Sequence, residues 1–487
     1  MKRLSFTIGI ATAVGALGFL LWLVTGYGRV WVHPEYFYQI DRHAFPNKHL
    51  GIRDLLDFFD CDAIGEKCTR ARFLTYLATG LIIKTRLLIW KFVPPHPSFS
   101  PIWLLSLGSL FCLFRTVLLL TKQRDVAYAI VGLYTVSVGF LSHFAHLLHA
   151  AKPLVSVLMI SSIYCAVRLV DLGLKAPVYS RRRWWIGLLA SLIGAFLSDE
   201  IGWVMWPAIP VIAPSLFIRD GRPVWRAICA YAALVPAVII FLTIAAPIGS
   251  GLIFGKHFNF WGWMFHWGWP LPEQGSAPDE LSFFQRLTIS AILSGGYNMW
   301  RNITVIPDIG SWAPMIGWCV TLILIGLSFF SPNKWLVARL FAVLCGYIVF
   351  QGLITLRQTN VVGHTTYHTY YYGSSFPIFA LLLLAPLLAS KVGRIAGLAL
   401  VPYVFVAQMA NFLLLNKDAA FSLERQSYPQ AITERYKGIG YNIPLTFQKT
   451  LELWRAARRG ETVEAYANQF SVSDLWLLRE MERVQSP

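Results

Sequence analysis

The chain contains a series of long apolar runs separated by polar connections. A transmembrane α-helix needs about 20 apolar residues to cross the hydrocarbon core of a bilayer, so each run is a candidate span. Only 14% of the residues are charged and 56% are hydrophobic, whereas soluble domains carry about 25% charged residues. These features exclude a water-soluble fold, and the sequence predicts an all-α polytopic membrane protein.

The runs predict about eleven transmembrane helices. They lie near residues 6–28, 101–120, 126–148, 153–171, 184–198, 203–218, 226–247, 312–330, 335–356, 374–389 and 395–415. The first run is too long for the apolar core of a signal peptide, so we expect it to remain as an anchor. We therefore expect a transmembrane domain over 1–415 and a soluble, α-helical C-terminal tail over 416–487.

Cations in the short connections predict the orientation. With a cytoplasmic N-terminus, the positive-inside rule is satisfied at every cytoplasmic connection. The cations concerned are Lys122, Arg124, Lys175, Arg181, Arg182, Arg183, Arg219, Arg222, Lys334, Lys391 and Arg394. The formal net charge of +17 is therefore interpreted as topology and contact with anionic lipid rather than nucleic-acid binding. An odd number of spans leaves the C-terminal tail outside.

The opposite, external side receives two long loops, 29–100 and 248–311, together with shorter turns at 149–152, 199–202 and 357–373. The apolar segment 284–306 carries polar residues that a lipid-facing span would not tolerate, so we expect a helix at the membrane surface there. Five of the seven cysteines fall inside predicted helices. Cys61 and Cys68 share the first external loop, where they are either a disulfide or two free thiols.

The first external loop is too amphipathic to be a simple connector. Residues 51–59 place Asp54 and Asp57 on one helical face and apolar residues on the other. A second predicted helix covers 70–92 and ends before the proline-rich stretch Pro94-Pro95-His96-Pro97. Both are expected to lie on the membrane surface as juxtamembrane helices.

This arrangement resembles the GT-C superfamily of integral-membrane glycosyltransferases. The local similarities are Arg70-Ala-Arg-Phe-Leu-Thr-Tyr, Ser198-Asp199-Glu200-Ile201-Gly202 and His368-Thr-Tyr-Tyr-Tyr-Gly-Ser-Ser-Phe-Pro. The resemblance implies inverting transfer of a sugar from a polyprenyl-phosphate donor to a glycan, lipid or protein acceptor on the external face of a bacterial inner membrane. No unambiguous Asp-Asp or Asp-x-Asp motif follows the first span, where the loop contains only Asp60-Cys61-Asp62, so the identity of the catalytic acid stays open.

Inverting transfer needs a carboxylate to accept the proton of the acceptor hydroxyl. The external candidates are Asp41, Asp54, Asp57, Asp199 and Glu200. Asp41 lies nearest the end of the first span and is the favoured base, with Asp54 and Asp57 as alternatives or as a solvated helix face. Asp199 and Glu200 interrupt an apolar stretch, where ionised groups are costly unless paired or solvated. They are interpreted as a second carboxylate, an acceptor or metal contact, or a wet turn.

The leaving phosphate needs cations to stabilise its charge. The external candidates are Arg72, Arg86, Lys152, Arg357, His364 and His368, of which Arg357 is favoured because a guanidinium suits phosphate. His143, His146 and His149 have helical spacing and are either polar lining or metal ligands. We assign no residue as a metal ligand, although a divalent metal cofactor stays open.

Two other classes of function remain. A transporter or flippase for a lipid-linked or anionic solute would also place polar groups inside a helical bundle, commonly near the bilayer midplane and with internal repeats. No repeat is evident between the halves of this chain, and its ionisable residues lie at helix ends. A non-catalytic assembly subunit is the third reading, and it would tolerate the loss of every candidate carboxylate.

Overall fold

The structure is a computed structural model of the whole chain. It describes residues 2–24, 103–145, 151–173, 177–219, 221–245, 289–307, 312–358, 375–425 and 454–461, together with the single positions 74, 75, 78, 81, 85, 89, 92, 248, 249 and 252. Side chains are described from Thr7 onward in the first helix. All statements below refer to these residues.

The described elements are helices apart from one two-stranded hairpin. The long helices are α1 (Lys2–Val24), α5 (Trp103–Thr121), α6 (Arg124–Thr135), α8 (Ala151–Leu172), α9 (Val178–Ser198), α16 (Ile289–Thr304), α17 (Ala313–Phe329), α18 (Lys334–Gln358), α20 (Phe376–Ala389) and α21 (Lys391–Arg425). The shorter elements are α7 (Val138–Ala145), η4 (Glu200–Val204), α10 (Met205–Ile212), η5 (Pro214–Leu216), β1 (Ile218–Arg219), β2 (Arg222–Pro223), α11 (Trp225–Ala232), α12 (Leu234–Ile240) and the π-helical turn η6 (Phe241–Ala245).

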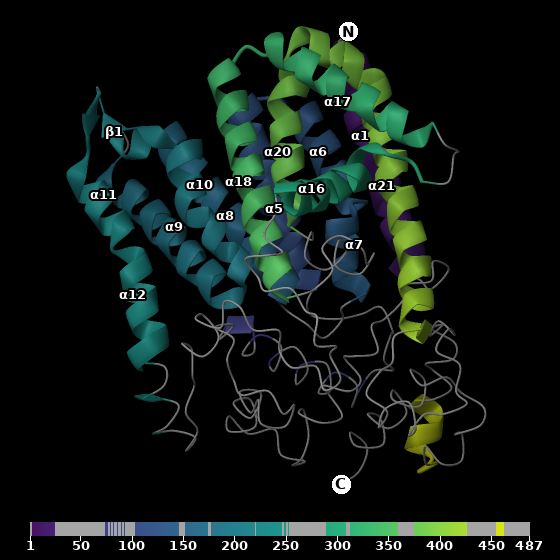
Figure 1. Ribbon diagram of the computed structural model, residues 1–487, viewed down its shortest axis with the longest axis horizontal. Coiled ribbons are helices and arrows are strands. Elements are labelled where there is room, and N and C mark those ends of the chain that lie inside the picture. Colours follow the sequence, from purple (N-terminus) through teal and green to yellow (C-terminus); the bar gives the residue numbers. More distant parts are fainter. Residues whose placement is uncertain are drawn as a thin grey trace.

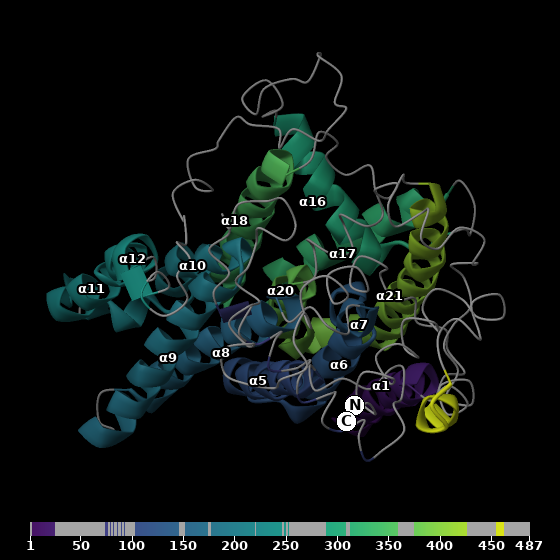
Figure 2. The same cartoon turned by 90° about the horizontal axis from the view of Figure 1, so that it is seen from below.

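Helix α20 occupies the centre of the bundle, with α5, α6, α18 and α21 around it (Figures 1 and 2). It is 14 residues long, and nearly all of its side chains are buried, from Phe376 to Leu388. A helix that is apolar all round is typical of a buried position. Its apolar neighbours form one continuous core that includes Tyr134, Phe140, Phe196 and Tyr347.

Every predicted apolar run overlaps helical residues, so the prediction of an all-α architecture is confirmed. Within the described parts of the chain, five segments are long and apolar enough to cross a membrane, judged by length and composition. They are Leu104–Thr121, Lys152–Leu172, Trp225–Ala245, Lys334–Leu353 and Lys391–Leu414. Several long apolar helices are compatible with an integral membrane protein. The expected number of about eleven spans stays a prediction.

Three predicted spans divide into shorter elements, and one of them, 203–218, comprises η4, α10, η5 and β1. The run 126–148 divides into α6 and α7 at Val136 and Ser137. The Ser137 hydroxyl accepts a hydrogen bond from the Phe140 backbone N–H at 3.2 Å and donates one to the Tyr134 carbonyl at 2.7 Å. A serine in this role caps a new helix rather than continuing the old one. The run 226–247 similarly divides into α11, α12 and η6.

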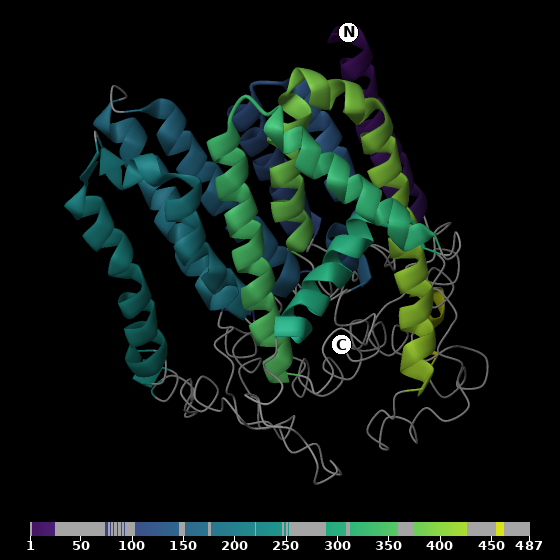
Figure 3. The same ribbon diagram turned by 45° about the horizontal axis from the view of Figure 1, so that its top comes forward.

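The ends of the helices separate into two groups (Figures 1 and 3). At one end, the helices are joined by short connections that include the β1–β2 hairpin and the α20–α21 junction. At the other end, α1 and α18 end and α8 and α20 begin. We call this second end the loop-side end, because the chain segments that follow α1 and α18 and precede α20 attach there.

Helix α16 covers most of the segment predicted to lie on the membrane surface. It runs crosswise to α18 and α21 rather than along them (Figures 1 and 2), and it packs against both. The Tyr403 hydroxyl of α21 donates to the Thr304 carbonyl at 2.9 Å, which anchors the C-terminal end of α16.

The predicted loop helices are described only in part. The described positions within 70–92 are helical up to Ile89, and Phe92 lies in a turn. The predicted helix at 51–59 and the cysteines Cys61 and Cys68 lie outside the described residues. The other five cysteines are free thiols within helices, as expected: Cys112, Cys165, Cys229, Cys319 and Cys345.

Helix α21 extends to Arg425, beyond the predicted end of the last span at 415. Residues 416–425 contain no Gly or Pro and include two alanines with Lys417, Leu423, Glu424 and Arg425, which favour helix, so the helix continues past the apolar stretch. In the tail, residues 454–458 are helical, and the Arg458 guanidinium lies 4.9 Å from the centre of the Trp454 ring.

Small residues allow α1 and α6 to pack closely. A Cβ atom added to Gly132 of α6 would lie 2.8 Å from the Thr12 Cγ2 atom and 2.9 Å from the Thr12 carbonyl. A Cβ at Gly9 of α1 would collide with the Asp125 carbonyl. Small residues that permit such contact are a common basis of helix association in membranes.

Replacing Gly132 with valine should therefore force α1 and α6 apart. We expect Gly132→Val to lower the free energy of unfolding by about 1–3 kcal/mol, as overpacking does. The matched control is Gly326→Val in α17, where an added Cβ meets no atom within 4 Å and the change should stay within about 0.5 kcal/mol. Unfolding in detergent micelles titrated with denaturant measures both. If Gly132→Val and Gly326→Val lower the free energy of unfolding equally, the close contact between α1 and α6 is contradicted.

Candidate functional site

Lys152 and Asp199 form a buried ion pair at the loop-side end of the bundle. The Lys152 Nζ atom donates to Asp199 Oδ2 at 2.8 Å, and only 4% and 2% of the two side chains are exposed. Lys152 lies in the first turn of α8, and Asp199 is the residue between α9 and η4. Two turns that are separate in the sequence therefore meet at one point.

The conformation at Asp199 follows from its role as a cap. Its backbone is extended, with φ −159° and ψ 152°, and its Oδ1 atom accepts the Ile201 N–H at 3.2 Å. One carboxylate oxygen of Asp199 thus caps the N-terminus of η4, and the other binds the Lys152 ammonium group. Position 202, within η4, requires a glycine, because a Cβ atom at Gly202 would collide with the Ala195 carbonyl of α9.

The sharp turn after α9 also contacts a residue of the segment predicted to be the first external loop. The Thr75 hydroxyl donates to the Ser198 carbonyl, and Thr75 is 1% exposed. Glu200, the first residue of η4, is 7% exposed. A residue from the predicted second juxtamembrane helix therefore contacts the peptide next to Asp199.

Further buried polar groups extend from the ion pair toward the middle of the bundle. The buried Tyr347 hydroxyl of α18 lies near Asp199 and Ser375, but among the described residues neither it nor the Tyr134 hydroxyl has a partner in hydrogen-bonding geometry. The Ser375 and Ser156 hydroxyls share a hydrogen bond at 2.9 Å. Ser156 in turn lies beside the hydroxyl of Tyr134. We call the groups from Asp199 to Tyr134 the polar track.

A second pair of polar groups lies near the inner end of the polar track. The Ser106 hydroxyl and His143 Nδ1 are 3.1 Å apart, and both residues are 1% exposed. The ring of Phe140 connects them to the track, at 5.3 Å from the Tyr134 ring and 6.0 Å from the His143 ring. Burying a polar side chain without hydrogen-bond partners costs free energy. A cluster of several buried polar side chains inside an apolar bundle therefore indicates a role other than packing.

The structure places three of the predicted site residues together and leaves most of the others outside its description. Lys152, Asp199 and Glu200 gather at the loop-side end. Arg357 lies in the last turn of α18 at the same end of the bundle. The structure describes its backbone but not its side chain. Predicted residues outside the described part of the chain are Asp41, Asp54, Asp57, Arg72, Arg86, His364 and His368.

The polar track was not predicted from the sequence. Single serines and tyrosines within apolar runs are ordinary in membrane helices, and a serine hydroxyl can hydrogen-bond to the backbone of its own helix. Ser156 of α8 and Ser375, which precedes α20, are far apart in the sequence, and the tertiary fold brings them together. A usable sequence signal was Pro377 two residues after Ser375, because proline near a helix start fixes where α20 begins.

The described residues do not include three or more His, Cys, Asp or Glu side chains grouped to hold a metal ion. His143 of the predicted histidine cluster instead lies against Ser106, and His146 and His149 are outside the described side chains. Comparisons of the chain with protein-family models, curated proteins and solved structures found no match. The site is therefore interpreted from its own geometry.

Removing one partner of the ion pair should destabilise the protein strongly. We expect Lys152→Met or Asp199→Leu to lower the free energy of unfolding by about 3–5 kcal/mol, because each leaves a buried charge without its partner. The double variant should recover most of the loss, since no charge then remains. A double-mutant cycle in detergent measures this coupling. If the double variant loses as much stability as the two single variants together, the two side chains do not interact directly.

Proposed function

We propose that this chain is an integral membrane glycosyltransferase of the GT-C type, with about eleven spans and a cytoplasmic N-terminus. It would transfer a sugar from a polyprenyl-phosphate donor to an acceptor hydroxyl on the external face. The single observation that carries this proposal is the buried pair of Lys152 and Asp199 at the loop-side end, 2.8 Å apart.

The pair supplies the two kinds of charge that the reaction needs. A polyprenyl phosphosugar leaves its phosphate as an anion, and a lysine at the membrane surface stabilises that charge. The acceptor hydroxyl loses its proton as it attacks, and a carboxylate accepts it. In the resting protein, Lys152 and Asp199 neutralise each other, which makes their burial tolerable.

Binding of the donor would rearrange this pair. A phosphate that takes Lys152 frees one oxygen of Asp199 while the other keeps its contact with the Ile201 N–H. Asp199 then accepts the proton of the acceptor hydroxyl. The acceptor oxygen forms a bond to the anomeric carbon from the face opposite the phosphate, and the bond from that carbon to the phosphate oxygen breaks. Polyprenyl phosphate leaves with the electron pair.

The location of the pair also supports this proposal. Lys152 and Asp199 lie at the end of the bundle where the chain's long connections attach, next to Thr75 from the first external loop. A lipid-linked donor presents its phosphate at the membrane surface, so a site at a helix end is within its reach. Arg357, placed by α18 at the same end, is a further cation for the phosphate.

A transporter for an anionic or lipid-linked solute is the second candidate. The observation in its favour is the break between α6 and α7 at Ser137, with buried polar groups on both sides. Interrupted helices around a polar interior are typical of transporters. A transporter would move solute in reconstituted vesicles without making a new glycosidic bond, and the same Lys152 and Asp199 variants would abolish that movement.

The transferase proposal predicts a large loss of transfer in variants of the pair. Asp199→Asn keeps the shape of the side chain but removes its basicity, and we expect transfer in membranes to fall by about 100-fold or more. Asp171→Asn is the matched control, because Asp171 forms exposed ion pairs with Lys122 and Arg168 at the opposite end of the bundle. The Asp171→Asn variant should retain transfer activity within about twofold of that of the unmodified protein.

The assay requires correctly folded protein, so the amount of each variant in the membrane is measured with its transfer rate. Full transfer by Asp199→Asn at equal abundance would exclude Asp199 as the base. Glu200→Gln tests the neighbouring carboxylate in the same way. If both variants stay fully active, the proposed chemistry at this end is wrong.

The proposed orientation predicts opposite labelling of two engineered cysteines. A cysteine replacing Arg182, near the start of α9, should react with a membrane-impermeant maleimide only after the membrane is opened. A cysteine replacing Thr365 should react in intact cells. The positive-inside rule is the reason for this expectation. Labelling of both positions from the same side would contradict the topology.

A further inference from the structure

Arginines gather at the end of the bundle opposite the loop-side end. Arg181 and Arg182 lie in the first two turns of α9, Arg222 lies in β2 and Arg226 lies in the first turn of α11. The hairpin and the start of α11 are side by side at this end (Figures 1 and 3). Arg181 is half-buried and the other three are exposed. We call these four arginines the basic surface.

Aromatic packing holds the two parts of the basic surface together. The centre of the Trp185 ring of α9 is 6.4 Å from that of the Phe217 ring, which is 5.0 Å from that of the Tyr231 ring of α11. The Phe217 carbonyl accepts the Val224 N–H at 2.8 Å, next to the β1–β2 hairpin. The start of α9, the hairpin and α11 are therefore fixed relative to one another.

Helical spacing places the two α9 arginines on the side of the hairpin. Arg181 and Arg182 precede Trp185 by four and three residues, so the three share one face of the helix. That face packs against Phe217, the residue before β1. The arginines of α9 and those of the hairpin and α11 thus belong to one continuous surface.

Little acidic charge balances the basic surface. Asp220, between the two strands, is the only acidic residue in the sequences 177–198 and 215–230. In the hairpin, Arg219 stands directly opposite Arg222, a register in which like charges are unfavourable. Ion pairs among the described residues are made by other cations, namely Lys122, Lys152, Arg168 and Arg459. The excess positive charge at this surface would be relieved by an anion.

Exposed apolar side chains border the basic surface. Val178, Tyr179, Ile218 and Trp225 are between 53% and 82% exposed. Trp225 also begins one of the segments long enough to cross a membrane, and another such segment ends shortly before α9. Aromatic residues at the ends of spans are typical of the level of the lipid headgroups. In a membrane, the basic surface would therefore lie where the bilayer presents its phosphates.

The positive-inside rule explains why cations occur at this end, but it does not require them to converge. A topological signal depends on the number of cations in a connection, whereas here residues from α9, β2 and α11 share one surface. All four are arginines, whose planar guanidinium groups bind phosphate oxygens through two parallel hydrogen bonds. This composition favours a phosphate-bearing partner.

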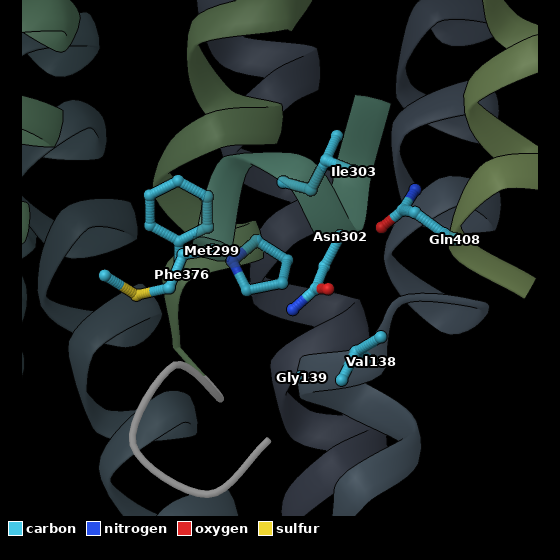
Figure 4. A pocket seen from close by; sticks show the side chains of 8 residues that line it. Val138, Gly139, Met299, Asn302, Ile303, Phe376 and Gln408 are labelled. Carbon is cyan, nitrogen blue, oxygen red and sulfur yellow. The ribbon is translucent and has the colours of Figure 1, made fainter. Parts of the chain in front are cut away.

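The cavity between α7, α16, α20 and α21 does not offer an internal site for such a partner. Gln408 and Asn302 line it from two sides (Figure 4). Its volume is about 10 Å³, which is the space that a single water molecule needs. A ligand of the size of a lipid headgroup is therefore not held there.

We propose that the basic surface binds the headgroup of an anionic phospholipid from the adjacent leaflet. Arg181 and Arg182 contact the headgroup from α9, and Arg222 contacts it from the hairpin. Tyr179 and Trp225 lie at the level between the headgroup and the acyl chains. The lipid joins α9 to α11 by neutralising the arginines of both, and this role is independent of the proposed sugar transfer.

Titration of the full-length protein with short-chain lipids in a neutral detergent tests the site. The probes are dioctanoyl-phosphatidylglycerol, dioctanoyl-phosphatidylcholine and glycerol 3-phosphate, with binding measured by native mass spectrometry. We expect phosphatidylglycerol to bind about tenfold more tightly than phosphatidylcholine. The double variant Arg182→Gln/Arg222→Gln should lose most of this preference, because two of the four cations are removed.

The matched control is the double variant Lys334→Gln/Lys391→Gln. It removes two exposed cations from the same end of the bundle, at the start of α18 and of α21, and should keep the preference. All four substituted side chains are exposed, so we expect both double variants to melt at the temperature of the unmodified protein when no lipid is added.

Four outcomes would overturn the proposal. Equal affinity for the two lipids would exclude an anionic site, and a preference that survives in Arg182→Gln/Arg222→Gln would place it elsewhere. An equal loss in the control would show that only total charge matters. Glycerol 3-phosphate binding as tightly as phosphatidylglycerol would identify a soluble anion as the partner. None of these measurements involves sugar transfer, so the result is separate from the fate of the proposed function.

Discussion

The contact between Lys152 and Asp199 joins the start of α8 to the end of α9 next to a largely apolar core. Two charges that are almost fully buried stay ionised only when they are next to each other, so the start of α8 and the end of α9 must remain in register. The same carboxylate begins η4 through the Ile201 N–H. The path of the chain into α10 therefore depends on a charge from another helix. Tyr347, Ser375 and Ser156 then continue this polar contact into the bundle.

The apolar runs were sufficient to predict the helices and their order, because a stretch such as 335–356 has few alternatives to a helix in an apolar environment. Breaks inside runs were harder to predict. Ser137 ends α6 through local hydrogen bonds that compete with the helix, and a single serine in an apolar stretch gives little warning of this. The extension of α21 to Arg425 was missed for the opposite reason, since helix propensity continued after hydrophobicity had ended.

The candidate site was predictable in part. Asp199 and Glu200 stood out because charges interrupt an apolar stretch, and Lys152 because it begins one. Their direct contact could not be predicted, because it depends on how α8 and α9 pack. Lys152 was expected to be a free phosphate ligand, whereas the structure gives it a partner. Gln408 of α21 was not singled out, since its burial without a hydrogen bond from any described residue is visible only in the folded chain.

The short length of α20 has an electrical consequence. Its 14 residues extend about 21 Å at 1.5 Å per residue, compared with about 30 Å for the hydrocarbon core of a bilayer. In a membrane, the insulating layer along the axis of the bundle would therefore be thinner than the layer around it. Phe376 is the first residue of α20, and the rings of Trp300 and Tyr347 pack against it. Aromatic side chains therefore gather at the end where this short helix begins, so in a membrane the missing length would be made up by aromatic rings.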